Sequence, residues 1–188
     1  MNIIRYSETY THRFAHHCKN LETNPTTAGN ILDVSSAKHR FESLSKPFGR
    51  GVLYWPALVV TSQQIIDERG TADRAGAAAF EFLSMASEEV MLCFAMTADC
   101  SDETIALVRF LENEQFDKSV LAPELDAFVH RLNILFDEGQ VLNTGYTAHM
   151  ISTVKRPIAV FLGGGQVKTL GSAAGISHEL AQKCSQRF

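Results

Sequence analysis

The stretch APELDAFVHRLNILFDEG, residues 122–139, contains the clearest helix in the sequence. Pro123 suits the first turn of a helix, where its missing N–H is not needed, and Gly139 is a typical residue after a helix end. Between them, apolar residues recur at helical spacing and form a wide stripe: Leu125, Phe128, Val129, Leu132, Leu135 and Phe136. We therefore predict an amphipathic helix over residues 123–138.

The next stretch, GYTAHMISTVKRPIAVFLGGGQVKTL at residues 145–170, has a different pattern. Its apolar residues alternate or run together, and KRP and GGG interrupt them, which predicts a β-meander of three strands. Two apolar runs, at 51–61 and 90–96, read as further buried strands, although the run at 90–96 also allows a continuation of the preceding helix. Residues 7–20, 72–87, 102–114 and the segment after Ser172 read as helices.

Together these elements predict an α+β fold, in which an antiparallel sheet from 51–61, 90–96 and 146–170 is covered by amphipathic helices. Strands and helices occur in runs and do not alternate, which argues against a doubly wound parallel sheet. The length of 188 residues, with 45% hydrophobic and 20% charged residues, fits one domain over 1–188. Within it, the polar, turn-rich segment 22–50 is expected to be mobile.

Membrane insertion is not expected, because no segment offers about 20 apolar residues without charges. The four cysteines are widely spaced and none forms a CxxC pair. This pattern indicates free thiols in a reducing, cytoplasmic compartment. Delivery into a host cell as an effector stays open, since such export signals have no sharp sequence pattern.

Charge is segregated along the chain, although the net charge is only −4. Residues 1–66 carry +3, residues 67–138 carry −11 and residues 139–188 carry +4. An acidic middle that falls in predicted helices indicates an acidic helical face. Such a face can steer and select a basic partner, or it can be an ordinary solvated layer.

The interpretation we favour is a non-enzymatic interaction protein, an inhibitor, adaptor or regulator that binds a protein with a basic surface. A nucleic acid partner is less favoured because the chain is acidic overall, although Lys38 and Arg40 lie among aromatic residues, as in some nucleic-acid-binding segments. The candidate partner-binding residues are Glu112, Glu114, Asp117, Lys38 and Arg40.

An enzyme is the second interpretation, with a scattered Cys/His site acting on a small or nucleotide-like substrate. Cys100 lies just before the helix predicted at 102–114, and a helix N-terminus lowers the pKa of a thiol. Three neighbouring carboxylates oppose that effect. The candidate catalytic residues are Cys100, His149 and His130.

A metal-binding protein is the third interpretation, and it rests on THRFAHHC at residues 11–18. His12 and His16 are one helical turn apart, a spacing that can place two imidazoles on one metal, and Cys18 is a candidate third ligand. Arg13 stands where a HExxH motif has its glutamate, and its charge opposes a dication. We therefore expect no cofactor.

Overall fold

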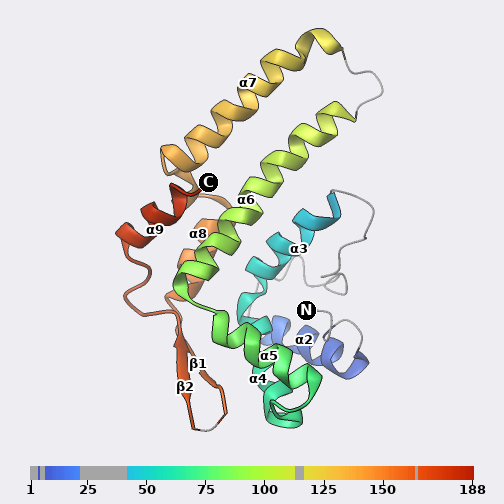
Figure 1. Ribbon diagram of the computed structural model, residues 1–188, viewed down its shortest axis with the longest axis vertical. Helices are drawn as coiled ribbons and strands as arrows, with labels where there is room; N and C mark the ends of the chain where they lie inside the picture. Colours follow the sequence, from blue (N-terminus) through green and yellow to red (C-terminus); the bar gives the residue numbers. More distant parts are fainter. Residues whose placement is uncertain (1–3, 5–6, 22–41, 113–116, 164) are drawn as a thin grey trace.

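The computed structural model describes residues 4, 7–21, 42–112, 117–163 and 165–188. Helices dominate it, and one antiparallel pair of strands lies near the C-terminus, so the α+β class is confirmed (Figure 1). In chain order the elements are α2 (Glu8–Asn20), α3 (Glu42–Leu53), α4 (Trp55–Arg69), α5 (Arg74–Met85), α6 (Glu88–Leu111), α7 (Leu121–Leu132), α8 (Gly145–Val154), β1 (Ile158–Phe161), β2 (Val167–Leu170) and α9 (His178–Ser185).

Three segments predicted as strands are helices instead. Residues 51–61 form the end of α3 and the start of α4, where Pro56 occupies the first turn of α4. Residues 90–96 lie inside α6, which Ser87 caps by accepting a hydrogen bond from the Val90 N–H at 3.2 Å. Both runs are buried around much of the helix, so their apolar residues show no period that distinguishes a helix from a strand.

The third of these segments, residues 146–154, is α8. Its own N-cap residue, Thr144, makes no side-chain cap bond. Asp99 of α6 caps it instead, accepting hydrogen bonds from the backbone N–H groups of Tyr146 and Thr147, both at 2.8 Å. A partner distant in the sequence therefore completes this helix, and the predicted three-stranded meander is a two-stranded hairpin.

The β-hairpin is held against the helices by two polar side chains. Ile158 pairs with Leu170 and Phe161 with Val167. Gln63 of α4 bonds both the N–H and the carbonyl of Phe161, and the Lys168 ammonium donates to the carbonyls of Leu83 and Ser84 at the end of α5. Lys168 thus fixes the hairpin to the end of α5.

The helices predicted from local signals form close to their expected positions. Ser7 caps α2 and Asp73 caps α5, each through its side chain. The C-terminal helix is shorter than predicted, because Ser177 caps it and not Ser172. The helix predicted at 123–138 is α7 followed by a π-helical turn, Asn133–Asp137.

The main core lies where α3, α4, α5, α6, α8 and the hairpin meet. The only tryptophan, Trp55, is 3% exposed there and packs against the rings of Phe82 and Phe94. Of the polar segment predicted at 22–50, residues 22–41 lie outside the described residues, and α3 begins at Glu42. Within the described part of the chain, no helix is both long and apolar enough to cross a membrane.

Candidate functional site

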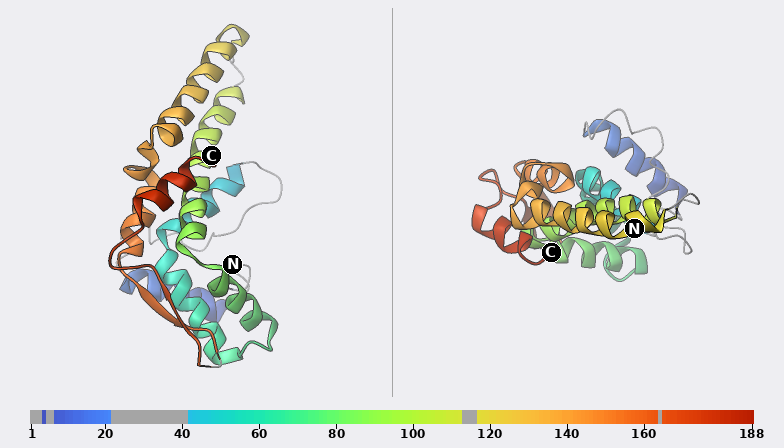
Figure 2. Two further views of the ribbon diagram at one scale, coloured as in Figure 1. Left: turned by 60° about the vertical axis from the view of Figure 1, so that its left-hand side comes forward. Right: turned by 90° about the horizontal axis from the view of Figure 1, so that it is seen from above.

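The second half of α6 and all of α7 project from the body as a two-helix hairpin (Figures 1 and 2). The 24 residues of α6 span about 36 Å. The first half of α6 contributes buried residues to the core. We call residues 102–132 the arm. Among its described residues, 102–112 and 117–132, Ile105 is the only buried one. Few side chains of the arm are therefore withdrawn from solvent.

Apolar side chains on the arm remain open to solvent. Leu111 and Val120, each 41% exposed, lie near its tip, while Leu125 and Val129, at 40% and 53%, lie one turn apart on α7. The stripe predicted on α7 exists, but it is wider than its contact with α6. One edge, which includes Phe128 and Leu132, is partly buried, and the edge formed by Leu125 and Val129 is exposed.

Arg131 of α7 fastens the two helices of the arm together. Its Nε donates to Glu103 of α6 at 3.0 Å, and a terminal nitrogen donates to Glu124 of α7 at 3.2 Å. One cation thereby joins two of the arm's carboxylates. Glu112 and Asp126 remain exposed on it.

Asp117, near the tip of the arm, is exposed and accepts a hydrogen bond from the Ser119 N–H at 2.9 Å, which lowers the pKa of its carboxyl group. Asp117 therefore stays ionised at neutral pH. Of the residues predicted to bind a partner, the structure places Glu112 and Asp117 close to this tip. Glu114, Lys38 and Arg40 lie outside the described residues.

The N-terminal histidines are not brought to one point with Cys18. His12 and His16 lie on the solvent side of α2, where His12 faces Glu8 and His16 contacts Asn20. Cys18 is buried on the opposite side, in an apolar cluster. No group of three or more His, Cys, Asp or Glu side chains is placed to hold a metal among the residues that the structure describes.

The predicted catalytic residues lie in three different environments. Cys100 is inside α6 and not at a helix N-terminus, as α6 begins at Glu88, and burial, with Glu103 adding to it, raises the pKa of its thiol. Burial lowers the pKa of His149 on α8, which keeps it neutral at pH 7. His130 is exposed on α7. No hydrogen bond joins the Cys100 thiol to either histidine in the described structure.

Asp99 and Tyr146 are polar residues whose roles the sequence did not reveal. Asp99 is 8% exposed, and besides its two backbone bonds it accepts the Thr147 hydroxyl at 2.6 Å. The Tyr146 hydroxyl bonds Asp102. These contacts orient α8 on α6, so we assign them to positioning and not to catalysis. No local motif marks them, because the partners are far apart in the chain.

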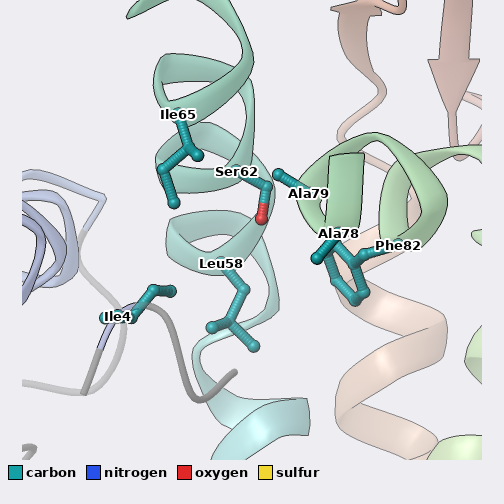
Figure 3. A pocket seen from close by; sticks show the side chains of 7 residues that line it. All are labelled: Ile4, Leu58, Ser62, Ile65, Ala78, Ala79 and Phe82. Atoms are coloured by element: carbon teal, nitrogen blue, oxygen red, sulfur yellow. The ribbon is translucent and has the colours of Figure 1, made fainter. Parts of the chain in front are cut away.

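A small hollow that is partly open to solvent lies between α4 and α5 (Figure 3). Ser62 supplies the only hydroxyl among the seven lining residues, and the others are apolar: Ile4, Leu58, Ile65, Ala78, Ala79 and Phe82. Since no ionisable side chain lines it, the hollow offers no acid, base or nucleophile. The arm is the feature of the described structure that best fits a functional surface.

Comparison with protein-family models, curated protein sequences and solved structures finds no significant match to this chain.

Proposed function

We propose that this chain is a non-enzymatic interaction protein whose arm binds a partner protein. The partner presents an apolar stripe flanked by Lys and Arg. The observation that carries the proposal is an exposed apolar edge on a projecting acidic hairpin. Solvent-exposed apolar side chains that group on one element are typical of contact surfaces, while scattered ones are not.

The apolar part of this surface is Leu125 and Val129 on α7, with Leu111 and Val120 toward the tip. These are four of the ten large apolar residues that are exposed in the described part of the chain. Covering them with a partner would remove apolar area from water, which favours association. The arm also stands clear of the body, so a partner helix could approach it without displacing another element (Figure 2).

The charge of the arm argues for a basic partner. Residues 102–131 carry seven Asp or Glu against three Lys or Arg, a net charge of −4. This equals the net charge of the entire chain, so the remainder is neutral as a whole. Complementary charge would steer a basic partner to the arm. Two copies of the arm would repel each other, which disfavours self-association through this surface.

The state of the cysteines is relevant to the cellular compartment in which this protein acts. None of the four, all of which lie in the described part of the chain, forms a disulfide. Free thiols are compatible with a reducing compartment such as the cytoplasm, which we include in the proposal.

A pair of synthetic helical peptides tests the proposal. One is amphipathic with a leucine stripe and lysines, and the other has glutamates in place of the lysines. We expect the lysine peptide to bind the full chain, with an affinity that falls as salt increases, and the glutamate peptide not to bind. Fluorescence anisotropy of the labelled peptides measures both. Equal binding of the two peptides would refute the charge argument.

Matched variants locate the binding. The double variant Leu125→Ser with Val129→Ser should bind the lysine peptide with an affinity about tenfold lower than that of the wild-type chain, equivalent to about 1.4 kcal/mol. The control, Met85→Ser with Val167→Ser, removes residues of similar exposure from α5 and β2. The double variant Glu112→Lys with Asp126→Lys should lower the affinity by a similar factor. Its control, Glu81→Lys with Glu179→Lys, reverses two charges outside the arm and should keep the affinity. If the controls lose as much affinity as the arm variants, the arm is not the site.

A further inference from the structure

Two free cysteines that are far apart in the sequence are neighbours where α9 packs against α6. Cys184 of α9 is fully buried, and Cys93 of α6 is partly buried against the same apolar cluster. The Cys93 thiol is near enough to that of Cys184 to help raise the pKa of Cys184. The two sulfur atoms therefore lie close together, although neither residue stands in a cysteine motif.

An ion pair beside the thiols fixes this register of α9 on α6. Glu89 lies one turn before Cys93 on α6, and Arg187 follows Cys184 by three residues, just beyond the end of α9 at Ser185. Arg187 Nη1 is 2.5 Å from Glu89 Oε1, and the guanidinium also lies beside the Cys93 thiol. Residues at these spacings share a helix face, so the ion pair and the thiol pair belong to one interface.

The other contacts of α9 lie at the base of the arm. The Ser185 hydroxyl donates to the Phe136 carbonyl at 2.5 Å, and the Phe188 ring stacks on that of Phe136 with 5.2 Å between centroids. Phe136 belongs to the π-helical turn that follows α7. A covalent bond between α9 and α6 would therefore act on the segment from which the arm projects (Figure 1).

We propose that Cys93 and Cys184 are a peroxide-sensitive thiol pair whose disulfide fastens α9 to α6. This is a modification site with a hydroperoxide as the co-reactant, and it does not depend on what the arm binds. Disulfides of cytosolic proteins are usually transient and redox-sensing, which suits a pair that stands reduced in the resting structure.

The two thiols would have different roles. Cys93 is the less buried of the two and lies beside the Arg187 guanidinium, so peroxide reaches it more readily than it reaches Cys184. Cys184 keeps its proton, because burial and then the adjacent Cys93 raise its pKa to about 11. Cys93 is therefore the residue that peroxide oxidises, and Cys184 is the residue that resolves the product.

The reaction balances with hydrogen peroxide alone. The Cys93 sulfur attacks one peroxide oxygen and breaks the O–O bond, which yields a sulfenic acid, and the departing hydroxide takes the thiol proton to form water. The Cys184 sulfur then attacks the sulfenic sulfur and displaces its hydroxide, which leaves with the Cys184 proton as a second water. Two thiols lose two electrons, and the peroxide is reduced to two waters.

The test uses the full chain, treated with hydrogen peroxide, denatured and alkylated with N-ethylmaleimide. We expect intact mass to show two alkylated thiols in place of the four of the reduced protein. Digestion with Asp-N protease and trypsin places Cys93 in a peptide of residues 75–98, Cys184 in 184–187 and Cys100 in another fragment. The expected product is the first two peptides joined, with the mass of the pair less two hydrogens.

The cysteine variants serve as controls. Cys93→Ser and Cys184→Ser should each keep three alkylated thiols after peroxide, while Cys100→Ser should fall from three to one. The proposal is overturned if the wild-type chain keeps four thiols, if Cys93 gains oxygen without a cross-link, or if the disulfide joins other cysteines or two chains. The result on wild type decides the matter even if a variant does not fold.

Discussion

Asp99 shows how one side chain organises a helix to which it does not belong. Its two carboxylate oxygens accept three hydrogen bonds from the start of α8, and it is 8% exposed. Two N–H groups and one O–H group donate to it, so this position requires a hydrogen-bond acceptor. A carboxylate satisfies all three donors, whereas an amide supplies only one acceptor atom and turns its NH₂ toward a donor.

Asp99→Asn should therefore destabilise the protein, by about 2 kcal/mol, because at least one buried donor is left without an acceptor. Thr147→Val, which removes only the hydroxyl bond, should cost about 1 kcal/mol. Urea unfolding followed by the fluorescence of the single tryptophan, Trp55, measures both. Equal stability of Asp99→Asn and wild type would show that the cap is unimportant.

The pH dependence of the same variant has a definite sign. Burial is the main cause that raises the pKa of Asp99 above its ordinary value, against the hydrogen bonds from Thr147 and Tyr146 that lower it. A carboxyl group with a raised pKa binds protons more strongly in the folded state. Its contribution to stability is thus complete below about pH 4 and declines as the pH rises through the folded pKa. The stability advantage of wild type over Asp99→Asn should shrink from about pH 4 to pH 7, as urea midpoints at both pH values would show.

At the scale of the element, α8 depends on a close approach between its first residue and α6. Gly145 has a φ of +71°, and a Cβ atom built on it would collide with the Asp99 carboxylate. Gly139 has a nearly equal φ of +74°, but a Cβ atom there would meet nothing within 4 Å. The two glycines differ in packing and not in backbone conformation, which makes them a matched pair.

Gly139→Ala should cost about 1 kcal/mol, the strain of a left-handed residue with a side chain. Gly145→Ala should cost about 3 kcal/mol or more, because the collision displaces Asp99 and its bonds to α8 in addition. Thermal unfolding of the two variants in parallel gives the comparison. Similar losses of stability in the two variants would mean that α8 can shift away from α6 to accommodate the added Cβ atom.

Over the whole molecule, stability is unevenly distributed between the body and the arm. Met91, Leu92, Ala95 and Met96 of α6 are at most 1% exposed, whereas α7 has no buried residue. The free energy of local unfolding increases with the number of buried apolar contacts, so the arm should unfold locally while the body stays folded.

Backbone amides in residues 106–111 and 121–132 should therefore exchange with deuterium faster than those in residues 91–98. Hydrogen-exchange mass spectrometry measures this directly. Addition of the lysine peptide should slow the exchange in the arm and leave the body unchanged, because the peptide would cover Leu125 and Val129. Equal protection of arm and body in the free chain would contradict this division.

The features of this protein that depend on near neighbours in the chain could be predicted from its amino-acid sequence. The helices at 7–20, 72–87 and 123–138 were predicted from i, i+3 and i, i+4 spacing, and the caps of the first two, Ser7 and Asp73, also act within one or two turns. The β1–β2 hairpin and the acidic character of residues 67–138 were readable for the same reason. These features were sufficient to predict the α+β class and the acidic charge of the arm.

Packing between distant segments determines which apolar runs are helices and which surfaces remain exposed to solvent. Residues 51–61, 90–96 and 146–154 were misread as strands, because buried runs show no period and because the cap of α8 comes from α6. Likewise, the stripe on α7 was visible, but its exposed edge depends on how many elements pack against it. Cys93 and Cys184 became neighbours only when α9 docked on α6, since proximity between distant residues is a property of packing and leaves no local pattern.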